Sequence, residues 1–137
     1  MSQPVRSTFR SLSWEETPVG QADALPKLTR ATCAQEYTGD IEGRSTLEYL
    51  MVHTEGGAAG GAATFVGMER VVGSMAGRDG SFALRHEGVF EGGVAKMTVT
   101  VVDGSGTGSL GGVRGAGSFA SAQAESYEIT LHCDFVD

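Results

Sequence analysis

The feature that most constrains the fold is a glycine-rich stretch near the C-terminus, Gly104 to Phe119, which reads GSGTGSLGGVRGAGSF. It holds seven of the chain's 21 glycines, and such density allows positive φ angles and close approach between backbones. Gly106 to Gly111 matches the dinucleotide-binding pattern G-x-G-x-x-G, which needs a helix directly afterwards to hold the pyrophosphate. Gly112, Gly115 and Gly117 disfavour that helix. The stretch therefore predicts a corner that closes a β-sheet, and no nucleotide cofactor.

The rest of the chain alternates between strand-like segments and turns, without the 3.6-residue periodicity and caps of helices. Strands are predicted over residues 5–14, 28–38, 43–54, 62–74, 81–90, 94–102 and 124–135, with a short one near 117–120. Loops or turns are expected over residues 15–26, 55–61, 77–80 and 91–93. The chain is thus predicted to be all-β, with residues 1–137 forming a single antiparallel β-barrel of about eight strands.

Alternation within strands predicts which side chains face the barrel interior. The apolar faces of the segments 81–90 and 124–135 contribute Phe82, Leu84, His86, Phe90, Tyr127, Ile129, Leu131, Cys133 and Phe135. The segments 43–54 and 62–74 sort less clearly, because Glu48 and Glu69 lie on largely apolar faces. Which face of these two segments points inward stays open.

Several side chains are candidates for a functional site inside such a barrel. Glu48, Glu69 and His86 are the candidate catalytic residues, because carboxylates and imidazoles can hold or transfer a proton. The candidate ligand-binding residues are aromatic: Tyr49, Phe65, Phe82 and Tyr127. We expect Glu69 to point inward, within reach of His86 or Tyr127. The structural alternatives are a hydrogen-bonded buried histidine, carboxylates that face solvent, and tyrosines that belong to the core.

Composition argues against several classes of partner and site. A formal net charge of −7 and a pI of about 4.9 disfavour nucleic acids and anionic membranes as partners. Neither a membrane-spanning apolar segment nor a secretory signal is evident, and Cys33 and Cys133 are too few for a disulfide scaffold. We therefore expect a cytoplasmic protein. His53, His86 and His132 lack metal-ligand spacing, so no metal site is predicted.

Four segments carry a resemblance to a known family: STLEYL at 45–50, GMERV at 67–71, GSFALRH at 80–86 and GTGSL at 106–110. In combination they resemble the bacterial family known as domain of unknown function 3224, over nearly the whole chain. This resemblance implies the antiparallel barrel of plant allene oxide cyclase and no established activity. More distantly, a strand ending in Glu-Tyr, a glycine-rich hairpin and a strand containing Glu are similar to bacterial spirotetronate cyclases, which act on polyenes without a cofactor.

These observations favour a barrel with an internal pocket for a small apolar ligand. A barrel of about eight strands has room for one small molecule or for packed side chains. The sharper hypothesis is a cofactor-independent cyclase or isomerase that holds its substrate near a reactive shape. A non-catalytic ligand carrier and a structural barrel remain the alternatives, and the sequence leaves open whether the chain forms a homo-oligomer.

Overall fold

The computed structural model describes residues 2–20, 24–55, 61–122 and 126–136, and all of their regular structure is β. The strands are β1 (Gln3–Pro18), β2 (Lys27–Gly39), β3 (Ile41–Glu55), β4 (Ala62–Met75), β5 (Arg78–Glu91), β6 (Val94–Val101), β7 (Thr107–Gly108), β8 (Val113–Ala122) and β9 (Tyr127–Phe135). Within this part of the chain there is no helix long and apolar enough to cross a bilayer.

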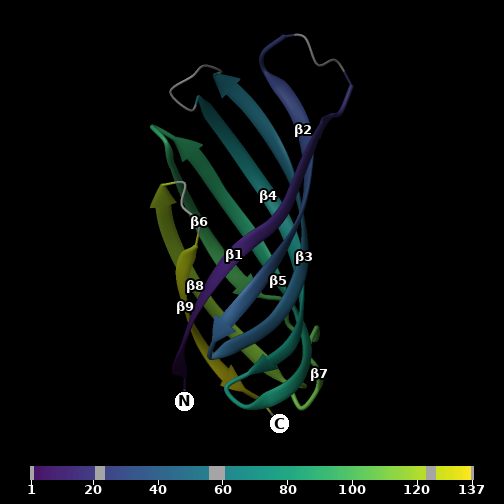
Figure 1. Cartoon of the computed structure of the whole chain (residues 1–137), viewed down its shortest axis with the longest axis vertical. Helices are drawn as coiled ribbons and strands as arrows, with labels where there is room; N and C mark the ends of the chain where they lie inside the picture. The colour runs from purple at the N-terminus through teal and green to yellow at the C-terminus, as the bar shows by residue number, and fades with distance from the viewer. Residues whose placement is uncertain (1, 21–23, 56–60, 123–125, 137) are drawn as a thin grey trace.

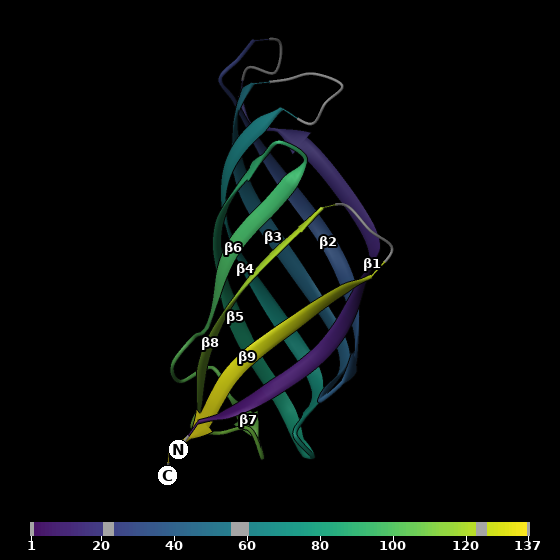
Figure 2. The same cartoon turned by 90° about the vertical axis from the view of Figure 1, so that its left-hand side faces the viewer.

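Eight strands pair into a closed antiparallel ring (Figures 1 and 2). The ring runs β1-β2-β3-β4-β5-β6-β8-β9 and closes where β9 pairs with β1. The short strand β7 pairs with β5 outside the ring. The predicted all-β barrel is therefore confirmed, with one added strand.

The strand β1 is longer than the sequence predicts and contains a bulge. Its pairing with β2 continues to Pro18, so the loop expected over 15–26 begins only after that residue, and residues 21–23 lie outside the described part. Ser11 and Ser13 pair with consecutive residues of β2, so one residue of β1 is left over between them. Because successive side chains of a strand alternate in direction, this extra residue reverses which ones face inward beyond it.

The glycine-rich stretch closes one end of the barrel, as predicted, and leads into a strand. β8 begins at Val113, so no helix follows the G-x-G-x-x-G pattern and the dinucleotide interpretation does not fit. Leu110 is fully buried at this end. A Cβ on Gly106 would clash with the carbonyl oxygen of Leu110, so only glycine allows this close turn. β8 is also longer than the short strand expected near 117–120.

Two other sequence expectations need adjustment. The turn expected over 77–80 lies at Ala76 and Gly77, which have φ angles of 51° and 81°, as hairpin turns of type I′ require. The predicted last strand begins at Tyr127; residues 124 and 125 lie outside the described part. Residues 56–60 of the expected hairpin tip also lie outside it.

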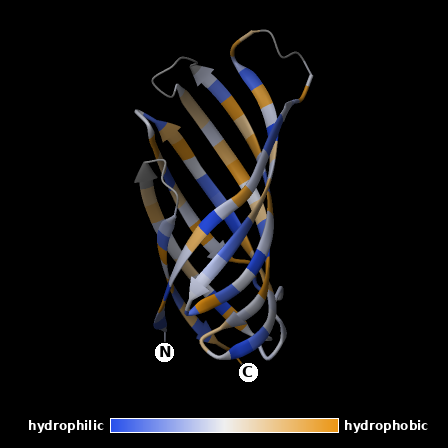
Figure 3. Cartoon of the chain, viewed as in Figure 1, coloured by the Kyte–Doolittle hydropathy of each residue, from blue (hydrophilic) through white to orange (hydrophobic). Residues whose placement is uncertain are grey.

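The barrel is packed solid in one half only. A core cluster fills the half toward the end where both termini lie (Figure 1), and its largest members include Phe82, Ile41, Met75, Leu84, Leu110 and Leu131. Polar and apolar residues alternate along the strands (Figure 3). The outer face of β3 and β4 is an exception, because Leu50, Val66 and Met68 are about half exposed there. The inner face of these strands carries Tyr49, Phe65 and Glu69 instead.

Candidate functional site

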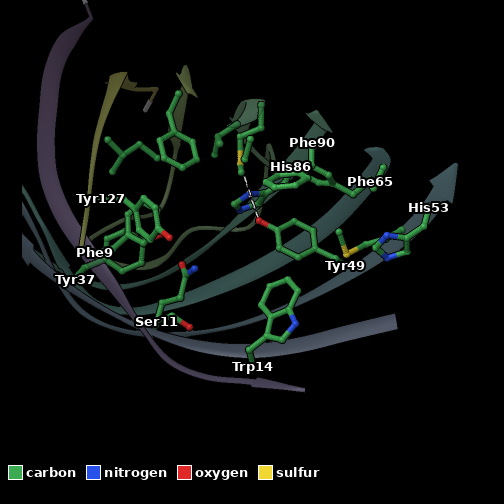
Figure 4. A pocket seen from close by; sticks show the side chains of 18 residues that line it. Phe9, Ser11, Trp14, Tyr37, Tyr49, His53, Phe65, His86, Phe90 and Tyr127 are labelled. Carbon is green, nitrogen blue, oxygen red and sulfur yellow. Dashed lines mark hydrogen bonds between the residues drawn. The ribbon is translucent and has the colours of Figure 1, made fainter. Parts of the chain in front are cut away.

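The other half of the barrel contains a cavity of about 590 Å³. This volume is typical of sites for drug-sized ligands. The lining includes eight aromatic side chains, many of them labelled in Figure 4: Phe9, Trp14, Tyr37, Tyr49, Phe65, Phe90, Phe119 and Tyr127. Trp14 is 49% exposed and the side chain of His53 is 25% exposed, so these two mark the mouth of the cavity.

A buried carboxylate lies behind the cavity wall. Glu69 is 1% exposed and receives hydrogen bonds from three other strands. Tyr37 on β2 and Ser45 on β3 donate their hydroxyl hydrogens to its Oε2, at 2.7 and 2.6 Å. His86 on β5 places Nε2 at 2.8 Å from Oε1. Inward positions of four neighbouring strands thus converge on one side chain, which satisfies a charge that burial would otherwise make costly.

These contacts assign a tautomer to His86. A carboxylate only accepts hydrogen bonds, so Nε2–H of His86 donates to Glu69. Nδ1 is then an acceptor, and the hydroxyl of Tyr49 lies 3.2 Å from it. The sulfur of Met97 lies 3.3 Å from the same nitrogen. Phenol, imidazole and carboxylate therefore form one hydrogen-bonded relay, with Tyr49 and His86 turned toward each other at the cavity wall (Figure 4).

The phenols of this network remain protonated at neutral pH. Burial raises the pKa of Tyr49 far above its ordinary value, and the charge of Glu69 raises it further. Burial and the same charge also raise the pKa of Tyr37. Both hydroxyls are consequently hydrogen-bond donors. Burial likewise raises the pKa of the Cys33 thiol to about 12, so this cysteine is an unreactive core residue.

The Tyr49 ring is positioned by a glycine on the adjacent strand. Tyr49 pairs with Gly67, and a Cβ on Gly67 would lie 2.5 Å from Cδ1 of that ring. The ring meets Phe65 and His86 edge-on, with centroids 5.1 and 5.6 Å away. The Tyr49 ring therefore fills the space that the missing side chain of Gly67 leaves.

We expect Gly67→Ala to lower the free energy of unfolding by about 1–3 kcal/mol, because the added methyl group overpacks the Tyr49 ring and the backbone of Glu48. Urea denaturation measures the loss. The matched control is Gly111→Ala, where a Cβ has only ordinary van der Waals contact and we expect a change within about 0.5 kcal/mol. Equal stability of the two variants would show that the ring does not rest on Gly67.

A second polar cluster lies at the mouth of the cavity. Glu16 on β1 accepts a hydrogen bond from Thr29 at 2.7 Å, and Nε2 of His53 lies 2.7 Å from the same oxygen. The indole nitrogen of Trp14 is 3.4 Å from the other oxygen. Burial raises the pKa of Glu16, but the hydrogen bonds from Thr29 and His53 outweigh it, so the pKa lies below its ordinary value. Glu16 is therefore ionised at neutral pH.

The structure brings most of the predicted site residues together. Tyr49, Phe65, Tyr127 and His86 line the cavity, and Glu69 lies directly behind His86, as expected. Their roles stay predictions. Among the described residues, no three His, Cys, Asp or Glu side chains are placed to hold a metal ion.

Glu48 and Phe82 lie elsewhere, and their assignment to the site is corrected. Glu48 follows an inward residue of β3, so it points outward, and its side chain is 64% exposed beside Arg30. Phe82 does face inward, but toward the packed half, where it is 1% exposed. Sequence reasoning also missed Trp14 and Glu16, because their inward direction depends on the bulge in β1.

Comparison with known proteins places the chain in a family without an assigned activity. The model of the family described as "Protein of unknown function (DUF3224)" matches residues 5–132. The crystal structure of a protein of unknown function from the DUF3224 family of Shewanella oneidensis MR-1 is similar over 100% of both chains, with 27% identity and a TM-score of 0.77. No curated protein matches.

Proposed function

The chain belongs to the DUF3224 family of proteins of unknown function, and we propose its function from the cavity: it binds a small, largely apolar molecule and moves one proton on it. The reaction class is a cofactor-independent isomerisation or cyclisation. The observation that carries this proposal is the hydrogen-bonded relay of Tyr49, His86 and Glu69 at the cavity wall.

The lining supports binding of an apolar ligand. Eight aromatic rings surround a space of about 590 Å³, which is large for a packed core and suited to a ligand of drug size. Polar groups reach the cavity at a minority of positions, among them Tyr49, His53 and His86, and such groups orient a mostly apolar molecule. A ligand seated there would replace water against ring faces and gain the free energy of apolar burial.

The relay supports proton transfer. Nδ1 of His86 is the base, and the Tyr49 hydroxyl, 3.2 Å away, is a donor that can rotate toward a carbonyl oxygen of the ligand. His86 takes a proton from a carbon next to that carbonyl, while Tyr49 stabilises the enolate oxygen. Glu69 stabilises the imidazolium that forms. Return of the proton to another carbon gives an isomer of equal mass, without an oxidant or reductant.

Cyclisation is the finer form of this proposal and depends on the sequence resemblance to spirotetronate cyclases. The same relay would then polarise a carbonyl of a folded polyene and need no net proton loss. A carrier would use the same cavity and return its ligand unchanged.

We expect Glu69→Gln to slow turnover by about 100-fold or more while ligand affinity changes little. The glutamine oxygen can keep the donors Tyr37 and Ser45, but its amide hydrogens face Nε2 of His86. His86 must then accept there and carry its proton on Nδ1, so the base is lost. Incubation with a library of enones and polyenes, followed by chromatography and mass spectrometry, measures conversion, and thermal shift measures binding.

The matched control is Glu48→Gln on the outer face of β3, which should leave both conversion and binding unchanged. Binding without conversion in the native protein would identify a carrier. Conversion by Glu69→Gln at the native rate would contradict the relay. If no apolar compound raises the melting temperature, the binding proposal itself is wrong.

A further inference from the structure

We propose that the ligand of this cavity is a cation: an organic amine or quaternary ammonium compound with an apolar body. This inference rests on the proposed function, because it presumes that the cavity binds a small molecule. It adds the ligand's charge, and it argues against fatty acids, phosphates and other anions as ligands. Three features of the cavity lead to it.

The first feature is the abundance of aromatic rings around one space. The face of an aromatic ring is the negative end of its quadrupole and attracts cations. Near the mouth, the rings of Trp14 and Tyr49 have centroids 6.1 Å apart and are tilted by 43°. On another wall Phe9 and Tyr127 stack with centroids 5.2 Å apart, and Phe119 meets Phe9 edge-on. Surfaces of several orientations therefore surround the space, as in aromatic cages for quaternary ammonium groups.

The second feature is the balance of charge at the cavity. Among the described residues, the lining includes neither lysine nor arginine. Glu16 and Glu69 contact lining residues: Glu16 bonds to Trp14 and His53 at the mouth, and Glu69 bonds to His86 behind the wall. Among the ion pairs of the described residues, each of the two is paired with a histidine. Two carboxylates therefore lie at the cavity, one at its mouth and one behind its wall. The protein interior screens the electric field of these carboxylates less than water would, so the field favours a positively charged ligand.

The third feature is the placement of the carboxylates relative to the rings. Nε1 of Trp14 lies 3.4 Å from Glu16 and donates its hydrogen to it, so an indole ring and a carboxylate stand side by side at the entrance. The side chain of Glu16 is 29% exposed, which lets it meet an incoming ligand while still in contact with water. The chain's net charge of −7 adds a long-range attraction for cations and a repulsion for anions.

The test compares three probes of nearly equal shape: 2-naphthyltrimethylammonium, 2-tert-butylnaphthalene and 2-naphthalenesulfonate. Isothermal titration calorimetry measures affinity. Fluorescence gives a second readout at the site, because Trp14 is the chain's single tryptophan and lines the cavity mouth. We expect the ammonium probe to bind about tenfold more tightly than the neutral probe, and the sulfonate to bind most weakly. Glu16→Gln should reduce this preference, whereas Glu48→Gln on the outer face should not.

The outcomes separate this inference from the proposed function. If the neutral probe binds as tightly as the ammonium probe or more tightly, the cavity is a ligand site, but the inference that its ligand is a cation is wrong. If the ammonium preference survives Glu16→Gln at full strength and is lost in Glu48→Gln, the attraction comes from the outer surface, and the inference is also wrong. If none of the three probes binds, the proposal that the cavity is a ligand site is wrong, and so is the inference that the ligand is a cation.

Discussion

Replacing Glu69 by alanine is expected to lower the free energy of unfolding by about 3–5 kcal/mol. The change leaves the hydroxyls of Tyr37 and Ser45 and the Nε2–H of His86 without their acceptor in the interior. Each buried donor without a partner costs about 1–3 kcal/mol, and the missing side chain leaves a cavity as well. Equilibrium denaturation in urea, followed by circular dichroism, measures the loss.

The control for this prediction is Glu48→Ala. It removes a glutamate from the neighbouring strand β3, on the outer face of the barrel. Its exposed pair with Arg30, at 4.0 Å, should make the change worth no more than about 0.5 kcal/mol. If Glu69→Ala does not yield folded protein, Glu69→Gln supplies the measurement, and its loss should be smaller because the amide oxygen keeps two donors. A loss for Glu69→Ala no larger than that for Glu48→Ala would contradict the observed network.

Replacing Phe82 by alanine is expected to cost about 3–5 kcal/mol of stability without weakening ligand binding. Phe82 is 1% exposed in the packed half of the barrel and does not line the cavity, so its removal leaves a void among core side chains. The matched residue is Phe65, which is also buried but lines the cavity. Denaturation measures the stability of each variant, and calorimetry with the tightest probe measures binding.

The leucine variants keep this comparison measurable if the alanine variants unfold. Phe82→Leu should lose some stability and keep native affinity, whereas Phe65→Leu should lose affinity because a ring that contacts the ligand is gone. Equal losses of affinity in the two variants would show that Phe82 borders the cavity after all, and would restore its original assignment as a ligand-binding residue.

Alternation along single strands was enough to predict the barrel and part of its interior. β5 and β9 each have one polar and one apolar face, so Leu84, His86 and Leu131 could be placed inside before any pairing was known, and all three are buried. The glycine-rich corner was equally readable, because Gly112, Gly115 and Gly117 disfavour a helix and Gly106 allows the close turn at Leu110. These signals are local, since each depends on residues close together in the chain.

The same alternation could not orient β3 and β4, because both of their faces are apolar. Leu50, Val66 and Met68 are about half exposed on the outer face. Glu48 and Glu69 therefore looked alike in the sequence, although one meets solvent and the other is buried. What separates them is that partners from other strands satisfy only the second carboxylate.

The composition of the candidate site also depends on pairing between strands that are distant in the sequence. The bulge between Ser11 and Ser13 turns Trp14 and Glu16 inward, and no residue type in that segment predicts the bulge. The relay needs Tyr49 on β3 and His86 on β5 to face one space, which depends on the register through β4. The residue pattern alone was sufficient to predict the strands, the closing corner and the inward faces of β5 and β9. The position and lining of the cavity depend on closure of the ring. Neighbours distant in the chain set which side of a strand with two apolar faces points inward, and they supply the partners of a buried charge.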